Sequence, residues 1–341
     1  MRKLKFAVFG TGFWSYYQLS GWKELEGAEP VAFCNRTLPR AQKLADQFGV
    51  QHVYDDPAEL LDRHAHELDF VDIISDVDSH ALLTLKTAAK GLPVICQKPM
   101  APNLEAARQM VEACREAGVK LYIHENFRWQ KPLRQLKEVL ESGKIGKPFK
   151  GRVTFTSAFP VFENQPFLAE LEEFILTDIG SHILDVCRFL FGEAASLCCH
   201  TARVNLGIKG EDVANVLLRM RNGVSCFAEM SYASLLEKEA FPQTLVQVEG
   251  DQGSVVLTHD FVLKVTTREG TTVTEATPEM YSWADPAYAL IHSSIVDCNR
   301  DLLQDLLGQG KAETTGEDNF ETIRLLYACY ESARENRVVF L

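Results

Sequence analysis

The sequence lacks long hydrophobic runs, an excess of basic residues and any paired cysteine motif, and each shortage excludes a class of protein. No uninterrupted apolar stretch reaches the roughly 18 residues that a membrane-spanning helix requires. Lys and Arg number 35 against 47 Asp and Glu, so the formal net charge is −12 and we expect no nucleic-acid partner. The nine cysteines form no Cys-x-x-Cys pair, which favours reduced thiols and a cytoplasmic protein.

Motifs for several other chemistries are also missing. The sequence has no Gly-x-Ser-x-Gly nucleophile elbow and no Walker phosphate loop. Cys198-Cys199-His200 offers metal-ligand types, but neighbouring side chains of a strand point to opposite faces, so we expect no metal site. We expect His64 and His66 on a solvated loop. Tyr281, Trp283 and Tyr288 could line a sugar site. We expect them in the core instead, because aromatic residues near the start of a helix are more often buried there.

Length and patterning predict two domains, the first of them α/β. At 341 residues the chain exceeds one typical domain. Its first third alternates continuous apolar runs with amphipathic stretches, which predicts a doubly wound parallel sheet of Rossmann type with helices on both faces. The predicted strands are Lys5–Phe9, Glu29–Cys34, Phe70–Ser75, Leu92–Gln97 and Lys120–Ile123. The predicted helices are Trp14–Leu25, Pro39–Phe48, His80–Lys90 and Leu104–Ala117.

Beyond Gly151 the pattern becomes strand-rich and predicts an α+β domain on a largely antiparallel open sheet. We therefore expect a cofactor domain over residues 1–126 and a substrate-binding and oligomerisation domain over 127–341, with the last helix packing near the first domain. The predicted strands are Arg152–Thr156, Leu197–Val204, Val213–Met220, Ser225–Ser231, Thr244–Glu249, Ser254–Thr258 and Phe261–Thr267. The predicted helices are Asp178–Phe191, Tyr288–Leu307 and Asn319–Glu335.

The turn Gly10-Thr11-Gly12-Phe13-Trp14-Ser15 joins the first predicted strand to the first predicted helix. It is a variant of the dinucleotide fingerprint in which Ser15 replaces the third glycine. Gly10 permits the tight turn, and Gly12 lets the backbone approach a pyrophosphate at the helix N-terminus. The position of this turn in the first strand–helix connection favours cofactor binding over a merely structural turn.

The end of the second predicted strand leaves the choice of dinucleotide open. An acid there would bind the ribose hydroxyls and repel a 2′-phosphate, but the chain has Asn35-Arg36. Asn35 suits a ribose, whereas Arg36 suits a phosphate or an adenine ring, or is a solvated loop charge. The residues themselves thus allow NAD or NADP.

Two further groups are candidates for proton transfer. Lys98 follows a predicted parallel strand, at the edge where ligands bind, and a nearby cationic nicotinamide would lower its pKa. Asp178, His182 and Asp185 follow helical spacing, so a carboxylate could orient the imidazole for acid–base work. The alternative is that Asp178 caps the helix and His182 is a core histidine.

Together these residues resemble the Gfo/Idh/MocA family of glucose–fructose oxidoreductases and inositol dehydrogenases. Gln97-Lys98-Pro99 stands where the family has Glu-Lys-Pro, and residues 75–80, from Ser75 through Asp76 to His80, stand where it usually has Thr-Pro-x-x-x-His. Asn126-Phe127-Arg128-Trp129 is similar to its Asn-x-Arg-Phe, and Asp178-x-Gly180-x-His182 matches its Asp-x-Gly-x-His. The resemblance implies an NAD(P)-dependent sugar or polyol oxidoreductase that assembles as a homodimer or homotetramer.

Within the family, residues 124–129, 159–168 and 174–182 resemble a subgroup of bacterial D-apiose dehydrogenases. This implies oxidation of the anomeric carbon of an aldose, D-apiose to D-apionolactone, with NAD favoured over NADP. Alternatives are another sugar or inositol-type dehydrogenase, an NAD-dependent glycosidase or a non-catalytic cofactor-sensing regulator.

The resemblance and the residue chemistry together assign roles to individual side chains. Lys98, His182 and Asp178 are the expected catalytic residues, placed in a cleft between the two domains. The expected substrate contacts are Asn126, Arg128, Asp178 and His182. The expected cofactor contacts are Gly10, Gly12, Phe13, Trp14, Asn35, Arg36, Ser75, Asp76, His80, Gln97 and Lys98.

Overall fold

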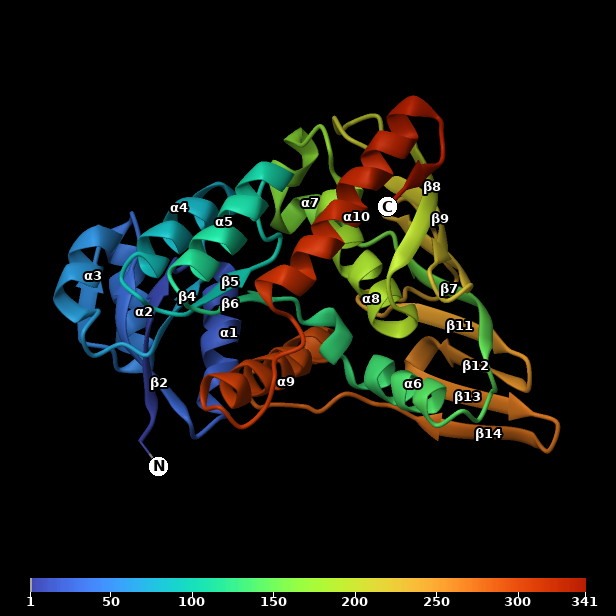
Figure 1. The fold of residues 1–341 in the computed structure, drawn as a ribbon, viewed down its shortest axis with the longest axis horizontal. Helices are drawn as coiled ribbons and strands as arrows, with labels where there is room; N and C mark the ends of the chain where they lie inside the picture. The colour runs from blue at the N-terminus through green and yellow to red at the C-terminus, as the bar shows by residue number, and fades with distance from the viewer. Residues whose placement is uncertain (1) are drawn as a thin grey trace. The chain divides into compact units, whose positions relative to one another are not determined.

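The computed structural model describes residues 2–341, which form two compact units (Figure 1). The first unit contains the residues up to Asn126 together with 280–287 and 292–323. The second contains 127–279, 288–291 and 324–341. The first unit thus takes segments from both halves of the sequence.

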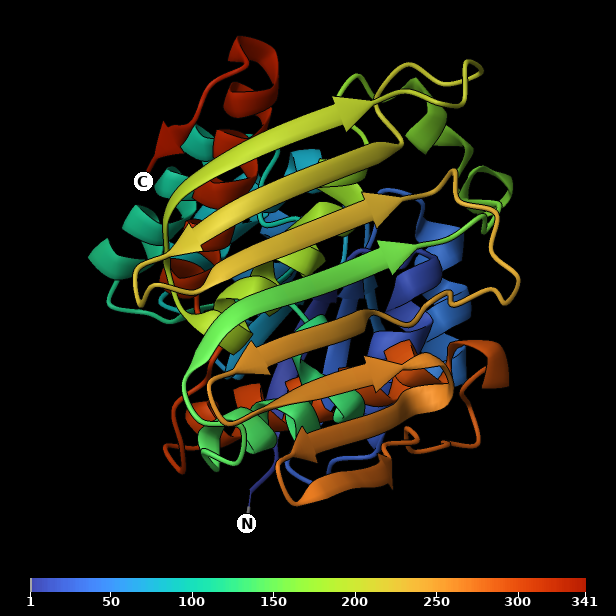
Figure 2. The same ribbon diagram turned by 90° about the vertical axis from the view of Figure 1, so that its right-hand side faces the viewer.

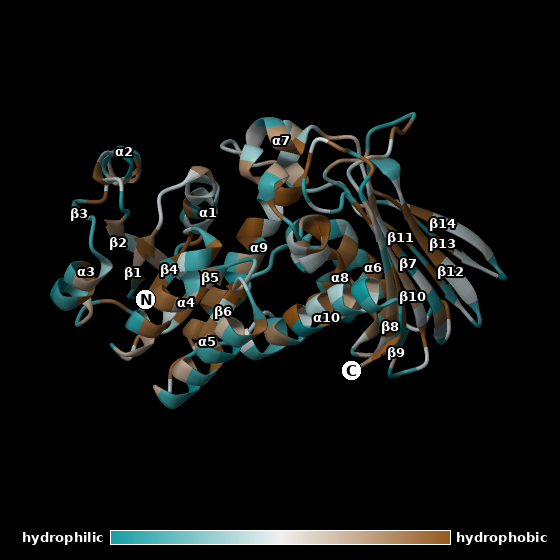
Figure 3. Cartoon of the chain, turned by 90° about the horizontal axis from the view of Figure 1, so that it is seen from above, coloured by the Kyte–Doolittle hydropathy of each residue, from teal (hydrophilic) through white to brown (hydrophobic). Residues whose placement is uncertain are grey.

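The first unit is built on a six-stranded sheet of parallel strands in the order β3-β2-β1-β4-β5-β6. This order reverses direction beside β1, as in doubly wound dinucleotide-binding folds, and places the ligand edge at the carboxyl ends of the strands. The strands are β1 (Leu4–Phe9), β2 (Ala28–Cys34), β3 (His52–Tyr54), β4 (Phe70–Ile73), β5 (Val94–Gln97) and β6 (Leu121–His124). In Figure 3, β5 and β6 are largely coloured as hydrophobic, in keeping with strands covered on both faces.

Helices α4 and α5 cover one face of this sheet and α1 lies on the other (Figure 1). The helices up to Asn126 are α1 (Phe13–Lys23), α2 (Leu38–Phe48), α3 (Pro57–His64), α4 (Val77–Ala88) and α5 (Leu104–Glu116). Gly49 ends α2 with a φ of +72°, a left-handed C-cap that glycine adopts readily. The expected solvated loop at His64 is wrong: this buried residue ends α3, and its ring bonds Tyr54 Oη at 2.9 Å and Glu67 Oε1 at 2.8 Å.

Most of helix α9 (Ala289–Leu306) belongs to the first unit, because α9 packs directly on α1. A Cβ atom at Gly21 would come within 2.7 Å of the Ile295 side chain, so the glycine permits the close approach. Asn299 donates from Nδ2 to the Gln18 carbonyl at 3.3 Å. This late segment therefore completes the helix layer beside the parallel sheet.

The second unit holds a nine-stranded sheet in the order β14-β13-β12-β11-β7-β10-β9-β8-β15 (Figure 2). Its pairings are antiparallel except for β10 with β7, which run parallel, so the expected largely antiparallel sheet is confirmed. The strands are β7 (Pro148–Thr156), β8 (Ala194–Ala202), β9 (Val213–Met220), β10 (Ser225–Ser231), β11 (Leu245–Gly250), β12 (Gly253–Thr258), β13 (Val262–Thr267), β14 (Gly270–Glu275) and β15 (Val339–Phe340).

One face of this sheet is buried under helix α8, which packs against β7 and β10. Side chains along β9 alternate between buried and exposed, and Leu217 on the other face is 45% exposed. In Figure 2, where that other face is toward the viewer, no helix among the described residues of this unit covers it. The α-helices that lie wholly or partly in this unit are α6 (Lys131–Glu141), α7 (Val161–Asn164), α8 (Ser181–Phe191), α10 (Gly316–Glu335) and the first residues of α9. None of the helices formed by residues 2–341 is long and apolar enough to cross a membrane.

Candidate functional site

The turn after β1 has the backbone geometry that a dinucleotide-binding loop requires. Gly10 has a φ of +99°, and a Cβ atom there would lie 2.3 Å from the Ile74 carbonyl oxygen, so no other residue fits. At Gly12 a Cβ atom would meet nothing within 4 Å, which leaves the approach to the α1 N-terminus open. Buried Ser15 donates from Oγ to the Gly10 carbonyl at 3.1 Å and closes the turn.

This cradle fits a pyrophosphate, because the α1 N-terminus presents backbone donors and a positive dipole end. Two buried groups beside it, Thr11 Oγ1 and Trp14 Nε1, have no hydrogen-bond partner within residues 2–341. Phe13 is 79% exposed at the first position of the helix. A bound dinucleotide would supply hydrogen-bond partners for these two donors and would cover the exposed ring.

The end of β2 meets the loop that follows β4. Asn35 donates from Nδ2 to the Thr37 carbonyl at 3.2 Å. Arg36 Nη2 lies 3.0 Å from Asp76 Oδ2, in an ion pair of exposed side chains. The two residues come from strands on either side of β1, so they sit at the carboxyl edge of the sheet. The structure thus brings together Arg36 and Asp76, which are 40 residues apart in the sequence.

His80 ties the loops after β4 and β5 together rather than facing outward. Its Nδ1 lies 3.0 Å from the Pro99 carbonyl oxygen, and its Nε2 lies 3.1 Å from the Ser75 carbonyl oxygen. The ring is buried, and this burial lowers the pKa of His80 although the backbone contacts act to raise it. A neutral imidazole donates from only one nitrogen, so His80 hydrogen-bonds one of these two carbonyls and packs against the other.

Gln97, at the end of β5, belongs to a buried polar network that reaches into the sheet. Its Nε2 donates to the Gln18 side-chain oxygen and to His124 Nδ1, the latter at 3.2 Å. Gln18 in turn donates to Asp72 at 2.8 Å, and His124 Nε2 bonds Asn299 Oδ1 at 3.0 Å. The side-chain nitrogen of Gln97 donates to two acceptors, a role that an ionised glutamate at this position does not fill.

Asp72 is the buried carboxylate of this network. Burial raises its pKa to about 7, although hydrogen bonds from Trp22 and Gln18 oppose the shift. Trp22 Nε1 donates to Asp72 Oδ2 at 2.9 Å. Lys98 follows directly on the network, since its backbone N–H donates to Gln97 Oε1 at 3.2 Å. The network therefore fixes the strand end from which the Lys98 side chain projects.

The second unit carries the other two expected catalytic residues. Asp178 lies in a π-helical turn, Leu176–Gly180, which runs directly into α8, so the uniform helical spacing expected from 178 to 185 is wrong. Its carboxylate accepts a hydrogen bond from Tyr232 Oη at 3.1 Å. His182 is 4% exposed and stacks on the Phe127 ring, with the centroids 3.8 Å apart and the planes at 12°. Tyr232 has no signal in the sequence beyond its place after a strand.

The two remaining substrate candidates make internal contacts. Arg128 is buried and forms a two-pronged ion pair with Asp185, with Nε 2.8 Å from Oδ2 and Nη2 closer still to Oδ1. This pair links the segment after β6 to α8. Asn126, in the first unit, donates from Nδ2 to Ser294 Oγ at 2.8 Å. These contacts indicate a supporting role for Arg128.

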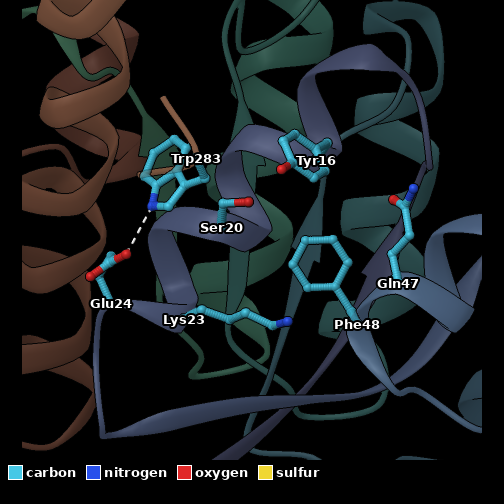
Figure 4. A pocket seen from close by; sticks show the side chains of 7 residues that line it. All are labelled: Tyr16, Ser20, Lys23, Glu24, Gln47, Phe48 and Trp283. Carbon is cyan, nitrogen blue, oxygen red and sulfur yellow. Dashed lines mark hydrogen bonds between the residues drawn. The ribbon is translucent and has the colours of Figure 1, made fainter. Parts of the chain in front are cut away.

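Trp283 is not a core residue, contrary to the expectation for aromatic residues at a helix start. It lines a pocket of about 430 Å³ on the first unit, together with side chains of α1 and α2 (Figure 4). Its Nε1 donates to Glu24 Oε1 at 2.8 Å, which fixes the indole, and its ring stacks with Tyr281. The full lining is Tyr16, Ser20, Lys23, Glu24, Gln47, Phe48 and Trp283.

Fold and loop geometry together define an oxidoreductase that binds a dinucleotide, and comparison with known families agrees. Residues 4–125 match the model of an oxidoreductase family with an NAD-binding Rossmann fold, and residues 133–256 match the C-terminal domain model of the same family. The chain belongs to the Gfo/Idh/MocA family of oxidoreductases, and NAD is its cofactor.

Its relatives include two enzymes of known substrate. The D-apiose dehydrogenase of Rhizobium rhizogenes is 43% identical over 99% of this chain and 98% of that protein. The D-apiose dehydrogenase of Paraburkholderia graminis is 44% identical over 100% of this chain and 90% of that protein. The crystal structure of an oxidoreductase from Agrobacterium radiobacter in complex with NAD⁺, L-tartaric acid and magnesium superimposes with a TM-score of 0.97, at 43% identity, over 99% of this chain and 98% of that one.

Proposed function

We propose that this oxidoreductase oxidises the anomeric carbon of D-apiose to give D-apionolactone. The observation that carries the proposal is the identity of 43% and 44%, over nearly the whole length, to two D-apiose dehydrogenases. Such similarity spans the C-terminal domain as well as the cofactor domain. It therefore includes the part of the chain that we expect to select the sugar.

The cofactor would be held by the turn from Gly10 to Ser15 and by the loops after β2 and β4. Bound NAD supplies the acceptor for the hydride, which leaves the sugar with both electrons of the C1–H bond. The protein has to hold the sugar with that bond facing the acceptor and to remove the proton of the C1 hydroxyl. Loss of hydride and proton together converts C1 to the lactone carbonyl.

We propose that Lys98 and His182 together accept the proton of the C1 hydroxyl. Asp178 orients His182 and binds the sugar. A well-placed general base contributes roughly 10²- to 10⁴-fold to such a step. His182 is buried against Phe127, which restricts the orientation of its ring. The hydrogen bond from Tyr232 Oη positions one oxygen of Asp178.

An initial-rate screen of pentoses and hexoses with NAD and NADP, followed by the absorbance of the reduced cofactor, tests this proposal. The highest kcat/KM is expected for D-apiose with NAD and with one NADH formed per sugar. Sugar release without net NADH would indicate a glycosidase. Tight NAD binding without turnover of any sugar would indicate a cofactor-sensing regulator. A sugar with a higher kcat/KM than D-apiose would replace it as the proposed substrate.

We further propose that the chain assembles as a homodimer or homotetramer through the exposed face of the nine-stranded sheet. Leu217 and Val273 are exposed there at 45% and 61%, next to the ion pairs Lys150–Glu249 and Arg152–Glu229. Val213, at the start of the same strand as Leu217, is half-buried. All nine cysteines are free thiols, which supports the proposed reducing, cytoplasmic location.

A further inference from the structure

The chain binds NAD although it lacks the acid that usually selects this cofactor at the end of β2. Asn35 stands there, and Arg36 beside it is the residue type best suited to a 2′-phosphate. An unpaired arginine at this edge would favour NADP. Arg36, however, has its Nη2 3.0 Å from Asp76 Oδ2, and 88% of its side chain is exposed to solvent.

The Asp76 carboxylate is free for this contact because it does not cap its helix. Asp76 occupies the N-cap of α4, where an aspartate normally accepts a hydrogen bond from a backbone N–H of the first turn. Here the side chain makes no such bond. The Asp76 backbone carbonyl instead accepts from Ser79 N at 3.0 Å and from Ser79 Oγ at 2.7 Å. The carboxylate is turned toward Arg36 rather than toward the helix.

We propose that Asp76 is the residue that makes this enzyme prefer NAD, by supplying from the β4 loop the carboxylate that is missing at the end of β2. It acts in two ways. It pairs with Arg36 and so reduces the attraction of that guanidinium for a 2′-phosphate. It also places a negative charge at the same edge of the sheet, where it repels the phosphate directly and can accept a hydrogen bond from a ribose hydroxyl.

The location supports this role independently of the ion pair. β2 and β4 lie on either side of β1, and the pyrophosphate turn at Gly10 lies between their carboxyl ends. In a doubly wound sheet the adenosine ribose extends from the pyrophosphate toward the end of β2. Exposed ion pairs contribute little to folding, so removing the Asp76 charge should leave the unit folded.

Asp76→Asn tests the proposal, with Asp78→Asn as the matched control. Asp78 is an exposed acid in the first turn of the same helix, so its removal changes the net charge and the helix dipole interaction equally. Asp76→Asn should raise the ratio of kcat/KM for NADP to that for NAD by about tenfold to a hundredfold, since a like charge at such a site discriminates by about that much. Asp78→Asn should change this ratio by less than about twofold.

Arg36→Gln completes the test as a double-mutant cycle. In the Asp76→Asn background it should remove most of the gain in NADP use, because no cation remains to hold the 2′-phosphate and only the loss of direct repulsion persists. An unchanged NADP ratio in Asp76→Asn, or an equal change in Asp78→Asn, would overturn the proposal.

A binding measurement separates this inference from the identity of the sugar. Calorimetric titration with 2′,5′-ADP and with ADP needs no sugar substrate and reports the 2′-phosphate alone. Asp76→Asn should bind 2′,5′-ADP at least about tenfold more tightly than the wild type does, while ADP binding stays within about twofold. Equal affinities of the two proteins for 2′,5′-ADP would contradict the role of Asp76 even if D-apiose proved to be the substrate.

Discussion

Among single residues, Lys98 and His182 differ in what holds them. The backbone of Lys98 is fixed through Gln97 and the buried network behind it. The ring of His182 is fixed by stacking on Phe127. A side chain whose neighbours already restrict it loses little entropy when a substrate binds, which favours catalysis.

Lys98→Met and His182→Ala should each lower kcat by about 10²- to 10⁴-fold, because each removes a group that handles the hydroxyl proton. NAD affinity, measured by calorimetry, should change little. The double variant should lose less than the product of the two single losses if the residues act as one unit. Lys90→Met, which removes an exposed lysine paired with Asp62, is the control and should leave kcat intact. Wild-type turnover in both single variants across a range of pH would show that neither residue handles the proton.

Asp178→Asn should raise KM for the sugar and also slow turnover, since an amide still forms hydrogen bonds but does not stabilise an imidazolium. Tyr232→Phe should shift KM in the same direction by a smaller factor, because it removes a hydrogen bond to Asp178 Oδ2. Tyr54→Phe deletes a hydroxyl that bonds the His64 ring at 2.9 Å in the first unit, and controls for loss of a tyrosine hydroxyl that does not contact Asp178 or its turn. Steady-state kinetics that do not distinguish Tyr232→Phe from Tyr54→Phe would refute the positioning role.

Among the elements, the sequence predicts those whose side chains follow a regular pattern. Strands β4 and β5 were predicted because burial on both faces makes them almost continuously apolar. Helix α5 was predicted because burial of one face gives its apolar residues a helical period. Strand β3 is three residues long, and all side chains of β14 are exposed, so neither carries a period. The π-helical turn at Asp178 was not predicted, because the extra residue of such a turn changes the helical spacing without changing the amino-acid composition.

Contacts between segments that are distant in the sequence are the second feature that could not be predicted. The turn at Gly10 was predicted because its constraint is local to the backbone. The pairing of Arg128 with Asp185 joins residues 57 positions apart, and that of Arg36 with Asp76 joins residues 40 apart. No local pattern distinguishes such a paired arginine from one that binds a ligand. Candidate site residues were therefore identifiable, but their partners were not.

The link made by His80 between the loops after β4 and β5 should be important for stability. His80→Ala should reduce the free energy of unfolding by roughly 1–3 kcal/mol at neutral pH, as expected for loss of a buried, hydrogen-bonded side chain. His66→Ala, at an exposed position, should have little effect. Burial lowers the pKa of folded His80, so its contribution is present above the unfolded pKa of about 6.5 and is lost as pH falls. Urea titrations with equal midpoints for both variants would show that the link contributes nothing.

For the whole molecule, Asp72 gives the opposite pH dependence. Its folded pKa of about 7 lies above the unfolded value of 3.8, so the folded state binds the extra proton. Stability should therefore fall as pH rises between these two values, by about 1.4 kcal/mol per pH unit at most. Asp72→Asn should remove this slope, and urea unfolding of both proteins from about pH 5 to pH 8 measures it. Parallel profiles of the two proteins would mean that Asp72 titrates normally.

Assembly is the other property of the whole molecule that the structure makes testable. Light scattering at micromolar concentration should give a mass that is a multiple of 38.3 kDa. Leu217→Glu should shift the mass toward the monomer, since it places a charge on the exposed sheet face. Leu82→Glu, on the exposed side of α4, should leave the mass unchanged. A monomer mass for the wild type would eliminate the proposed interface.

The burial of the thiols has a practical consequence. Eight of the nine cysteines are buried, whereas Cys198 is exposed and pairs across the sheet with Leu217 of β9. Burial raises the pKa of thiols such as Cys34 and Cys96 and keeps them protonated and unreactive. The dissociated protein should therefore take up one equivalent of a maleimide dye at Cys198, and the assembled protein should react more slowly because this thiol lies on the face proposed to associate. The rate of that labelling, followed as the protein is diluted, would report the opening of the interface without any engineered probe.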